Sequence, residues 1–407
     1  MKILVCNKFY FPKGGDCVYS IELEKLLKKN GHETAFFAMN HPQNHFSTYS
    51  QYYPSTVDYS TKNLANLQEQ LLRPIFSVEV KKKFNALLEA FKPDIVHVNN
   101  IHSQLSPIIV KEAYKKGIPV VWTLHDYKLI CSRYDSMRNE KPCELCYQDK
   151  TNVIRHKCLK GSLAASMLAY TEATWWSSDR LEKYTSKFIS PSTFLKEKMV
   201  TGGFNPSKII TLPNFIDEKK IADQPEVKED YYCFVGRLSK EKGIDTLCEA
   251  ACKIPSHKLL IIGTGPEEKF LKEKYSCPNI QFLGHKGWIE LQPIIAKAKC
   301  LVIASKWYEN NPLSVIEALA NGTPVIGAKI GGIPELIQDG VNGLLFEPGN
   351  SDDLKNKIDL FFDSFYSKID NTSLIEQIKK NHSSEKYYFK LITLYESLLS
   401  TPSLITA

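Results

Sequence analysis

Two basic residues lie five positions apart in the stretch FVGRLSKEKGID, which spans residues 234–245. Val235 ends an apolar run of strand type, and Gly236 allows a tight turn after it. Arg237 then falls at the carboxyl edge of the expected sheet, where open α/β folds bind ligands. Lys242 falls near the start of the next helix, whose dipole favours an anion. Arg binds planar oxygens bidentately and Lys supplies a compact charge, so the pair suits a diphosphate. A surface Arg and Lys on an ordinary loop explain this stretch equally well.

A proline-containing helix start follows in the stretch ENNPLSVIE at residues 309–317. Pro312 suits the first turn of a helix, because its missing N–H would have no intrahelical partner there. The backbone amides after it are then free to bind phosphate oxygens at the helix N-terminus. The residues that we expect to bind a phosphorylated ligand here are Asn311, Leu313 and Ser314, with the amide of Val315.

Two glutamates bracket this helix start. Glu317 falls about one turn inside the helix, and a carboxylate that accepts from vicinal hydroxyls is the usual way to hold a ribose. Glu309 precedes the helix and is placed to bind the hydroxyls of a sugar beyond the phosphates. The alternative is a helix start with two incidental glutamates.

A Gly-x-Gly pattern, Gly263 and Gly265, ends the strand-like run in IIGTGPE at 261–267. Glycines let the backbone approach a ligand that a side chain would block, and a plain strand–helix turn explains them equally well. The pattern lacks the third glycine of the dinucleotide fingerprint, which argues against a dehydrogenase.

Strand-like and helix-like segments alternate along the whole chain. The expected strands are 2–6, 34–38, 94–99, 119–124, 231–235, 258–262, 280–283, 300–304, 323–326 and 343–346. The expected helices between them are 18–30, 107–116, 245–253, 267–275, 289–297 and 315–320. Strand–helix–strand repetition gives right-handed crossovers and parallel sheets. We therefore expect an α/β protein with two Rossmann-like doubly wound domains that face a central cleft.

The join between the two domains is expected near residues 188–194. This gives a first domain at 1–190, with a cysteine-containing insertion at about 131–160, and a second domain at 191–382. The segment 383–407 carries an amphipathic helix at 383–399, which we expect to cross back and pack on the first domain.

Composition limits the class of protein. The chain has 407 residues and a formal charge of +7; residues 1–190 hold 26 Lys+Arg against 18 Asp+Glu, and the remainder holds 26 against 27. The basic first half suggests an anionic partner, such as a membrane surface, a phosphate or an acidic acceptor, or else a solvated lysine-rich surface. We find no secretory signal, no apolar run of ~18 to 20 residues and no nucleic-acid-binding motif. Eleven cysteines without a secretory signal favour a reducing compartment. These observations predict a cytoplasmic protein that binds no nucleic acid and is at most peripheral to the inner face of the membrane.

Four cysteines in the insertion have the spacing C-x11-C-x2-C-x11-C: Cys131, Cys143, Cys146 and Cys158. A structural zinc site is one interpretation. Free buried thiols are the interpretation we favour, and disulfides are the least expected.

The segment Arg155–Lys187 is basic and aromatic, and contains the pair Trp175 and Trp176. It fits a helix at a membrane interface, and equally a core helix whose tryptophans pack inside the first domain. We favour the core slightly. The membrane interpretation would suit a lipid-linked acceptor.

Taken in order, these motifs resemble glycosyltransferase family 4, the retaining enzymes of the GT-B fold. The resemblance spans GRLSKEKG at 236–243, GTGPE at 263–267, the two glutamates, and EALANGTPVIGAKIGGIPELIQDGVNGLLF at 317–346. FISPSTF at 188–194 and LPNFID at 212–217 resemble the family's inter-domain segments. The resemblance implies a hexosyltransferase-type enzyme that moves a sugar from a UDP- or GDP-sugar to a hydroxyl of a glycan or lipid-linked acceptor, in bacterial polysaccharide or glycolipid biosynthesis.

The resemblance also implies residue roles. Arg237 and Lys242 match the family's diphosphate pair, Glu309 the carboxylate at the donor sugar, and Glu317 the carboxylate at the ribose. His125, after VVWTLH, matches the first-domain histidine near the donor sugar. Gly14 and Gly15 match the family's first-domain glycine loop less closely, because KGGDCVYS shares mainly the glycine pair.

The implied chemistry stabilises a leaving diphosphate with protein cations and helix amides, and needs no cofactor; no Asp-x-Asp metal motif occurs. The family's retention is explained by front-face attack, so Glu309 is not expected to be a nucleophile. His125 would position the sugar, or else serve as a packing histidine. The alternatives are a nucleotide-sugar epimerase or phosphorylase on the same fold, or a non-catalytic nucleotide-sugar-binding protein.

Overall fold

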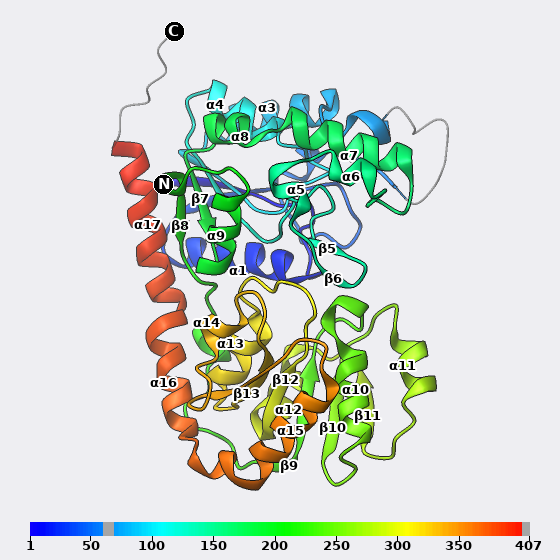
Figure 1. Cartoon of the computed structure of the whole chain (residues 1–407). Helices are drawn as coiled ribbons and strands as arrows, with labels where there is room; N and C mark the ends of the chain where they lie inside the picture. Colours follow the sequence, from blue (N-terminus) through cyan, green and yellow to red (C-terminus); the bar gives the residue numbers. More distant parts are fainter. Residues whose placement is uncertain (60–68, 401–407) are drawn as a thin grey trace. The chain divides into compact units, whose positions relative to one another are not determined.

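The computed structural model describes residues 1–59 and 69–400, which divide into two compact units (Figure 1). The first comprises Met1–Ser136, Cys143–Leu212 and the C-terminal part from Tyr388 onward. The second comprises Met137–Pro142 and Pro213–Tyr387. Each unit is built around its own six-stranded parallel sheet, so the expected pair of doubly wound domains is confirmed.

The sheet of the first unit has the strand order β2-β1-β3-β4-β7-β8. Its strands in chain order are β1 (Lys2–Cys6), β2 (Glu33–Phe37), β3 (Ile95–Val98), β4 (Val120–Thr123), β7 (Lys187–Ser190) and β8 (Ile209–Thr211). The helices of this unit are α1 (Gly15–Lys29), α3 (Val78–Phe91), α4 (Ile108–Lys115), α5 (Leu145–Gln148), α6 (Asn152–Arg155), α7 (Leu163–Trp175), α8 (Ser178–Tyr184) and α9 (Thr193–Thr201). Most residues of these strands are apolar and buried, because both faces of a parallel sheet are covered.

The join between the domains was expected near residues 188–194. Strand β7 overlaps this range and β8 follows it, and both belong to the sheet of the first unit. β7 pairs with β4, and β8 pairs with β7, both in parallel. The first unit therefore extends to Leu212 before the chain passes to the second.

The sheet of the second unit has the order β11-β10-β9-β12-β13-β14. Its strands are β9 (Glu229–Val235), β10 (Lys258–Ile262), β11 (Ile280–Gly284), β12 (Ala298–Ile303), β13 (Val325–Ala328) and β14 (Gly343–Phe346). Its helices are α10 (Ile244–Cys252), α11 (Glu268–Lys274), α12 (Trp288–Lys297), α13 (Leu313–Ala320), α14 (Ile333–Leu336), α15 (Ser351–Leu360) and α16 (Asn371–His382).

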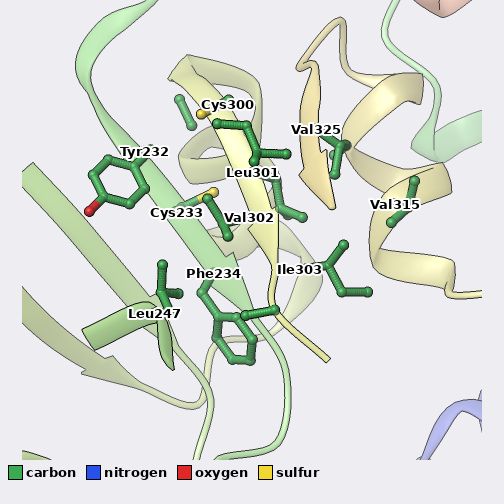
Figure 2. Close-up of a cluster of buried hydrophobic side chains, with 14 of the residues drawn as sticks. Tyr232, Cys233, Phe234, Leu247, Cys300, Leu301, Val302, Ile303, Val315 and Val325 are labelled. Carbon is green, nitrogen blue, oxygen red and sulfur yellow. The ribbon is translucent and has the colours of Figure 1, made fainter. Parts of the chain in front are cut away.

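The core of the second unit is centred on the neighbouring strands β9 and β12. Cys233 and Phe234 of β9 and Leu301 of β12 pack in one apolar cluster with Leu247 of α10 and Val315 of α13 (Figure 2). These side chains are almost completely buried, and burial of a Leu or Phe side chain contributes about 1.5–3 kcal/mol. The strands β9 and β12 are therefore firmly held by the core of this unit.

The last helix, α17 (Ser384–Ser400), joins the two units along the sequence, with Tyr388 as its first residue in the first unit. Leu391 and Tyr395 are fully buried. The Tyr395 hydroxyl hydrogen-bonds Nδ1 of His97 on β3. The C-terminal helix thus contributes to the core of the first unit, as its amphipathic pattern predicts.

Candidate active site

The loops that carry the predicted ligand residues leave two neighbouring strands of the second unit. After β9 the chain turns toward β10 on one side, and after β12 it turns toward β13 on the other. The point between β9 and β12 is therefore the topological switch point of the sheet. Open α/β sheets bind ligands there, outside the carboxyl ends of the strands. The loop at 236–243 and the loop at 304–312 both begin at this point.

Lys242 and Glu309 meet across the switch point. The distance from Lys242 Nζ to Glu309 Oε1 is 2.6 Å, and Ser305 Oγ donates to the same oxygen at 2.6 Å. Burial alone would raise the pKa of Glu309, but the Lys242 ammonium and these hydrogen bonds outweigh it and hold the pKa below its ordinary value. The carboxylate is therefore ionised, although it is buried. The Lys242 ammonium also lies 5.0 Å from the centre of the Trp307 ring.

A glycine pair between β13 and α14 fixes the backbone of Glu309. Gly331 has φ +61°, and a Cβ on it would lie 2.4 Å from the Glu309 carbonyl oxygen. The N–H of Gly332 donates to that same oxygen at 2.6 Å. This pair lies in the stretch at 317–346 that resembles the family, and no role was predicted for it. Two consecutive glycines a few residues after a strand were the available signal.

Arg237 is exposed at the end of β9. Within residues 1–59 and 69–400, its guanidinium forms no ion pair at 4.0 Å or less. An unpaired guanidinium on the same loop as the partly exposed Lys242 ammonium makes this edge of the sheet attractive to an anion with more than one negative charge.

Gly263 and Gly265 support the Arg237 loop. A Cβ on Gly263, whose φ is +136°, would lie 1.9 Å from the carbonyl oxygen of Gly236, and one on Gly265 would lie 2.2 Å from that of Leu238. The two loops are also joined by hydrogen bonds from Gly236 N–H to the Ile262 carbonyl and from Leu238 N–H to the Thr264 carbonyl, both 3.0 Å. A ligand approach and a plain strand–helix turn explained these glycines equally well; the close backbone approach in the structure is that of the neighbouring loop, and ligand binding at the glycines stays a prediction.

Helix α13 begins at Leu313, two residues before the expected helix at 315–320 and one residue after Pro312, which was expected in its first turn. Pro312 is its N-cap, and the Pro312 carbonyl accepts hydrogen bonds from Val315 at 3.1 Å and Ile316 at 3.4 Å. The expected free amide of Val315 is therefore already used. Leu313 and Ser314 are the first two residues of the helix, where no preceding turn supplies acceptors for their amides.

Asn311 is buried and binds the chain itself. Its side-chain Oδ1 accepts a hydrogen bond from the backbone N–H of Asn214 at 2.9 Å, and its backbone carbonyl accepts one from Asn214 Nδ2 at 2.8 Å. Asn214 belongs to the LPNFID segment, so Asn311 anchors the start of the second unit to the site loop.

Glu317 has a cationic partner that sequence analysis missed. Lys220 Nζ lies 3.4 Å from Glu317 Oε1 and 4.8 Å from the centre of the Trp288 ring. Burial raises the pKa of Glu317, and Lys220 opposes this rise. Lys220 is nearly a hundred residues away in the sequence, and no motif connects it to the glutamate.

In the first unit, Gly14 and Gly15 form the start of the fifteen-residue helix α1, with Gly14 as N-cap. A Cβ on Gly15 would meet nothing within 4 Å, and one on Gly14 would meet only the Asp16 carboxylate, at 3.2 Å. Unlike Gly263 and Gly265, neither glycine is required by the packing of the protein. The space beside them is open to a ligand.

His125 follows β4 in the first unit. Its Nε2 lies 3.0 Å from Asn99 Oδ1, and its ring contacts the edge of Tyr19 with centres 4.9 Å apart. Burial lowers the pKa of His125 to about 4; the Asp16 carboxylate opposes this effect and Lys8 adds to it. The imidazole is therefore neutral near pH 7, and a hydrogen bond to Asn99 Oδ1 places its proton on Nε2.

A buried chain of polar groups lies behind His125. The Tyr19 hydroxyl is 3.3 Å from Thr123 Oγ1, which is 2.8 Å from His97 Nε2, and His97 Nδ1 bonds Tyr395. These groups come from α1, β4, β3 and α17. Sequence analysis missed the chain because its members share no local motif.

The four insertion cysteines do not form the zinc site that was one of the three interpretations. None of the four forms a disulfide, and the described part of the chain contains no group of three or more ligands that suits a metal ion. Cys146 packs with Val153 and Ala169, and burial raises the pKa of its thiol to about 12. The insertion is ordered by apolar contacts and a short hairpin, β5 (Met137–Arg138) with β6 (Lys141–Pro142).

Cys252 and Cys277 form a disulfide, with their Cα atoms 5.7 Å apart. The composition predicts a cytoplasmic protein, and disulfides are rare in that reducing compartment. The pair joins the end of α10 to the segment before β11, a proximity that cysteine counting cannot reveal.

Of the two tryptophans at the end of α7, one fits the core interpretation and the other is exposed, as the membrane interpretation requires. Trp176 is buried and donates to the Ile75 carbonyl at 3.2 Å, whereas Trp175 is half exposed. No helix within residues 1–59 and 69–400 is long and apolar enough to span a membrane.

Two relatives show how far the similarity extends. An N-acetyl-alpha-D-glucosaminyl L-malate synthase from Bacillus anthracis is 24% identical over 418 residues and covers 98% of each chain. The O-antigen biosynthesis glycosyltransferase WbnH of Escherichia coli is 31% identical over 170 residues, which is 40% of this chain and 46% of the relative.

Solved structures with the same fold are more distant in sequence. Sucrose-phosphate synthase from Thermosynechococcus elongatus has a TM-score of 0.72 at 18% identity, covering 98% of this chain and 99% of its own. Anabaena HepE in complex with UDP-glucose has a TM-score of 0.68 at 17% identity, covering 98% and 100%. These likenesses confirm the expected GT-B fold.

Family models match both halves of the chain. The model described as Glycosyl transferases group 1 matches residues 216–381. The model described as Glycosyltransferase Family 4 matches residues 14–220, about half of the sequence. The chain belongs to glycosyltransferase family 4.

Proposed function

We propose that this glycosyltransferase moves a sugar from a UDP- or GDP-sugar to an acceptor hydroxyl, with retention at the anomeric carbon and without a metal ion. The observation that carries the proposal is the Lys242–Glu309 pair at the switch point, beside the unpaired Arg237. The structure of HepE, which shares the fold, was solved with UDP-glucose. This supports a nucleotide sugar as the donor.

In the proposed reaction, negative charge gathers on the diphosphate as the bond to the anomeric carbon breaks. Arg237 and Lys242 stabilise that charge, and the first amides of α13 add to the effect. Stabilisation that grows with the leaving-group charge lowers the barrier more than it strengthens ground-state binding. Phosphate oxygens would then replace Glu309 as the partner of Lys242.

Glu309, released from Lys242, would accept hydrogen bonds from the donor sugar, and Glu317 would bind the ribose. His125 would position the sugar as a neutral donor or acceptor, since its lowered pKa keeps it uncharged. Retention follows if the acceptor attacks on the face that the diphosphate leaves, with a phosphate oxygen taking the acceptor's proton. No protein nucleophile is needed.

The acceptor would be a glycan or a lipid-linked saccharide. WbnH, which resembles 40% of this chain, is named for O-antigen biosynthesis. This supports a role in bacterial surface-polysaccharide or glycolipid assembly.

The test measures thermal stability and nucleotide release with a panel of nucleotide sugars in EDTA. One nucleotide sugar should raise the melting temperature and be turned over slowly without added metal. Arg237→Ala should lose nucleotide affinity, and Glu309→Ala should lose turnover more than binding. Lys269→Ala removes a fully exposed cation of the same unit and is the matched control. If no nucleotide or nucleotide sugar shifts the melting curve, the diphosphate site is refuted.

The retention proposal is tested on the product. Proton NMR of the first product formed should show the anomeric configuration of the donor. An inverted configuration would rule out front-face attack. Release of an altered free sugar without any acceptor would indicate an epimerase instead.

A further inference from the structure

The exposed face of α7 carries no charge. Its exposed residues are Leu163, Ala164, Met167, Thr171, Thr174 and Trp175. The side chains of Leu163, Met167 and Trp175 are 50%, 49% and 48% exposed. The only charged residue of this helix, Glu172, is buried and pairs with Lys128 at 2.8 Å. A helix face in contact with water normally carries charged or polar side chains, so this face is unusual.

The two threonines on this face do not make it polar. Thr171 Oγ1 donates to the Met167 carbonyl and Thr174 Oγ1 to the Tyr170 carbonyl, each at 2.9 Å. Such back-bonding satisfies the hydroxyl within the helix and leaves the methyl group outward. The exposed face of α7 is therefore effectively apolar over its whole length.

A second exposed apolar segment lies next to α7. Trp176, at the end of α7, donates to the carbonyl of Ile75 at 3.2 Å. Around Ile75, Leu71, Leu72, Phe76 and Val78 are exposed. Exposed apolar groups gathered from two segments mark an interaction surface more strongly than scattered single residues do. We call the exposed residues of α7 and of 71–78 the apolar face.

Basic residues border the apolar face. Residues 150–171 contain four Lys or Arg and no Asp or Glu, and Arg155, Lys157 and Lys160 among them are exposed. They belong to α6 and the segment after it, which packs on α7 (Figure 1). At the other end of α7, the Arg180 guanidinium lies 4.7 Å from the centre of the Trp175 ring. On α8 the basic Arg180 and Lys183 are matched by Asp179 and Glu182, so the excess positive charge lies on the α6 side.

We propose that the apolar face docks this enzyme on an anionic lipid bilayer, with Leu163, Met167 and Trp175 in the interface and Arg155, Lys157 and Lys160 on the lipid headgroups. Apolar burial and attraction to anionic lipid together give the reversible binding of an interfacial helix. Tryptophan and arginine suit this depth, because each presents an apolar body and a polar tip. Two copies of the face would bring like charges together, which favours lipid over self-association.

The experiment uses the full chain and sedimentation with vesicles of phosphatidylcholine, with and without phosphatidylglycerol. The wild type should sediment with the anionic vesicles, and less so as salt is added. Met167→Glu with Trp175→Glu should lower the partition coefficient about tenfold or more. Lys157→Glu with Lys160→Glu should lower it by roughly fivefold or more per charge on anionic vesicles only.

The matched control is Val227→Glu with Ile289→Glu, which adds the same charge at residues of the second unit that are 86% and 89% exposed. This control should sediment like the wild type. Circular dichroism and the melting shift with UDP are recorded for every variant. An unchanged UDP shift in a variant that has lost vesicle binding separates this surface from the donor site, so either proposal can fail alone.

Three outcomes overturn the docking proposal. The first is a wild type that binds neither kind of vesicle. The second is a Met167→Glu/Trp175→Glu variant that binds as the wild type does. The third is a dimer in sedimentation velocity that this variant dissociates while vesicle binding is absent, because the apolar face would then join two copies of the chain.

Discussion

Lys242 and Glu309 form an ion pair, 2.6 Å between Nζ and Oε1, that joins the loops after two neighbouring strands of one sheet. The loops belong to segments 67 residues apart in the sequence. Because the pair sits at the topological switch point, its members hold the two sides of the candidate site together in the free protein. The same two groups are the ones that we propose to separate when a nucleotide sugar binds.

Removing one member of this pair should cost more stability than removing both. Lys242→Met leaves a buried carboxylate without its cation, and we expect a loss of about 2–4 kcal/mol in the free energy of unfolding. The double variant Lys242→Met/Glu309→Gln should recover part of the loss, because no buried charge remains. Urea unfolding of the wild type, both single variants and the double variant measures the coupling. Additive losses would mean that the pair has no coupling energy.

The pair should also make stability sensitive to acid. The folded pKa of Glu309 lies below its ordinary value of 4.5, so its stabilising contribution is complete above 4.5 and is lost as the pH falls through the folded pKa. Glu309→Gln should therefore flatten the dependence of unfolding free energy on pH below 4.5. Denaturant unfolding at several acidic pH values measures the slope, and parallel curves for the two proteins would contradict the assignment.

Arg237 is predicted to act on ligand binding and not on folding. It is exposed, and its guanidinium has no ion-pair partner among the residues that the structure describes, so Arg237→Ala should leave the melting temperature nearly unchanged. Affinity for UDP or GDP should fall by about tenfold or more, since a charge-assisted bidentate contact is lost. Arg237→Lys should recover only part of it. Isothermal titration of each variant with both nucleotides is the measurement, and Lys269→Ala should titrate like the wild type.

Much of this arrangement was predictable, and the parts that were not share a physical cause. Strands such as β1 and β10 are continuous apolar runs, and Pro312 marks the start of α13 to within one residue. The sequence placed Lys242 and Glu309 in one ligand site, and their direct pairing comes from the structure. Lys220 was missed because a single lysine carries no local pattern.

Glycine roles were the hardest to predict from the sequence. Gly15 and Gly263 both occur in glycine-containing loop sequences, and the sequence does not distinguish their roles. Only coordinates show that a Cβ on Gly15 meets open space, while one on Gly263 would meet a carbonyl oxygen at 1.9 Å. Glycine is required both where the backbone approaches a ligand and where it approaches a neighbouring loop, so the residue type alone does not tell the two cases apart.

This contrast predicts opposite effects of one substitution at two glycines. Gly263→Ala should destabilise the second unit by about 2 kcal/mol or more, because φ is +136° and the Gly236 carbonyl must move. Gly15→Ala should leave stability unchanged or raise it by up to about 1 kcal/mol, because alanine favours the first turn of α1. If the donor uses the open space at Gly15, turnover should still fall. Thermal unfolding measures the stability of both variants, and nucleotide release measures their turnover. A Gly263→Ala protein as stable as the wild type would contradict the steric argument.

His97 is predicted to limit stability in mild acid. Burial lowers its pKa to about 3, with the nearby His125 adding to the effect, whereas the ordinary value is 6.5. The unfolded chain therefore binds a proton that the folded chain does not between these values. Stability from this residue is complete above pH 6.5 and falls steadily as the pH approaches 3. His97→Gln removes the titration, so its unfolding free energy should change less between pH 7 and pH 5, even if its value at pH 7 is lower.

Tyr395→Phe is the companion variant: it leaves His97 Nδ1 without its hydroxyl partner and should cost about 1–3 kcal/mol at every pH in this range while keeping the wild-type slope. Chemical unfolding at half-unit steps of pH distinguishes a change in slope from a constant offset, and a wild-type slope in His97→Gln would place the acid sensitivity at another group.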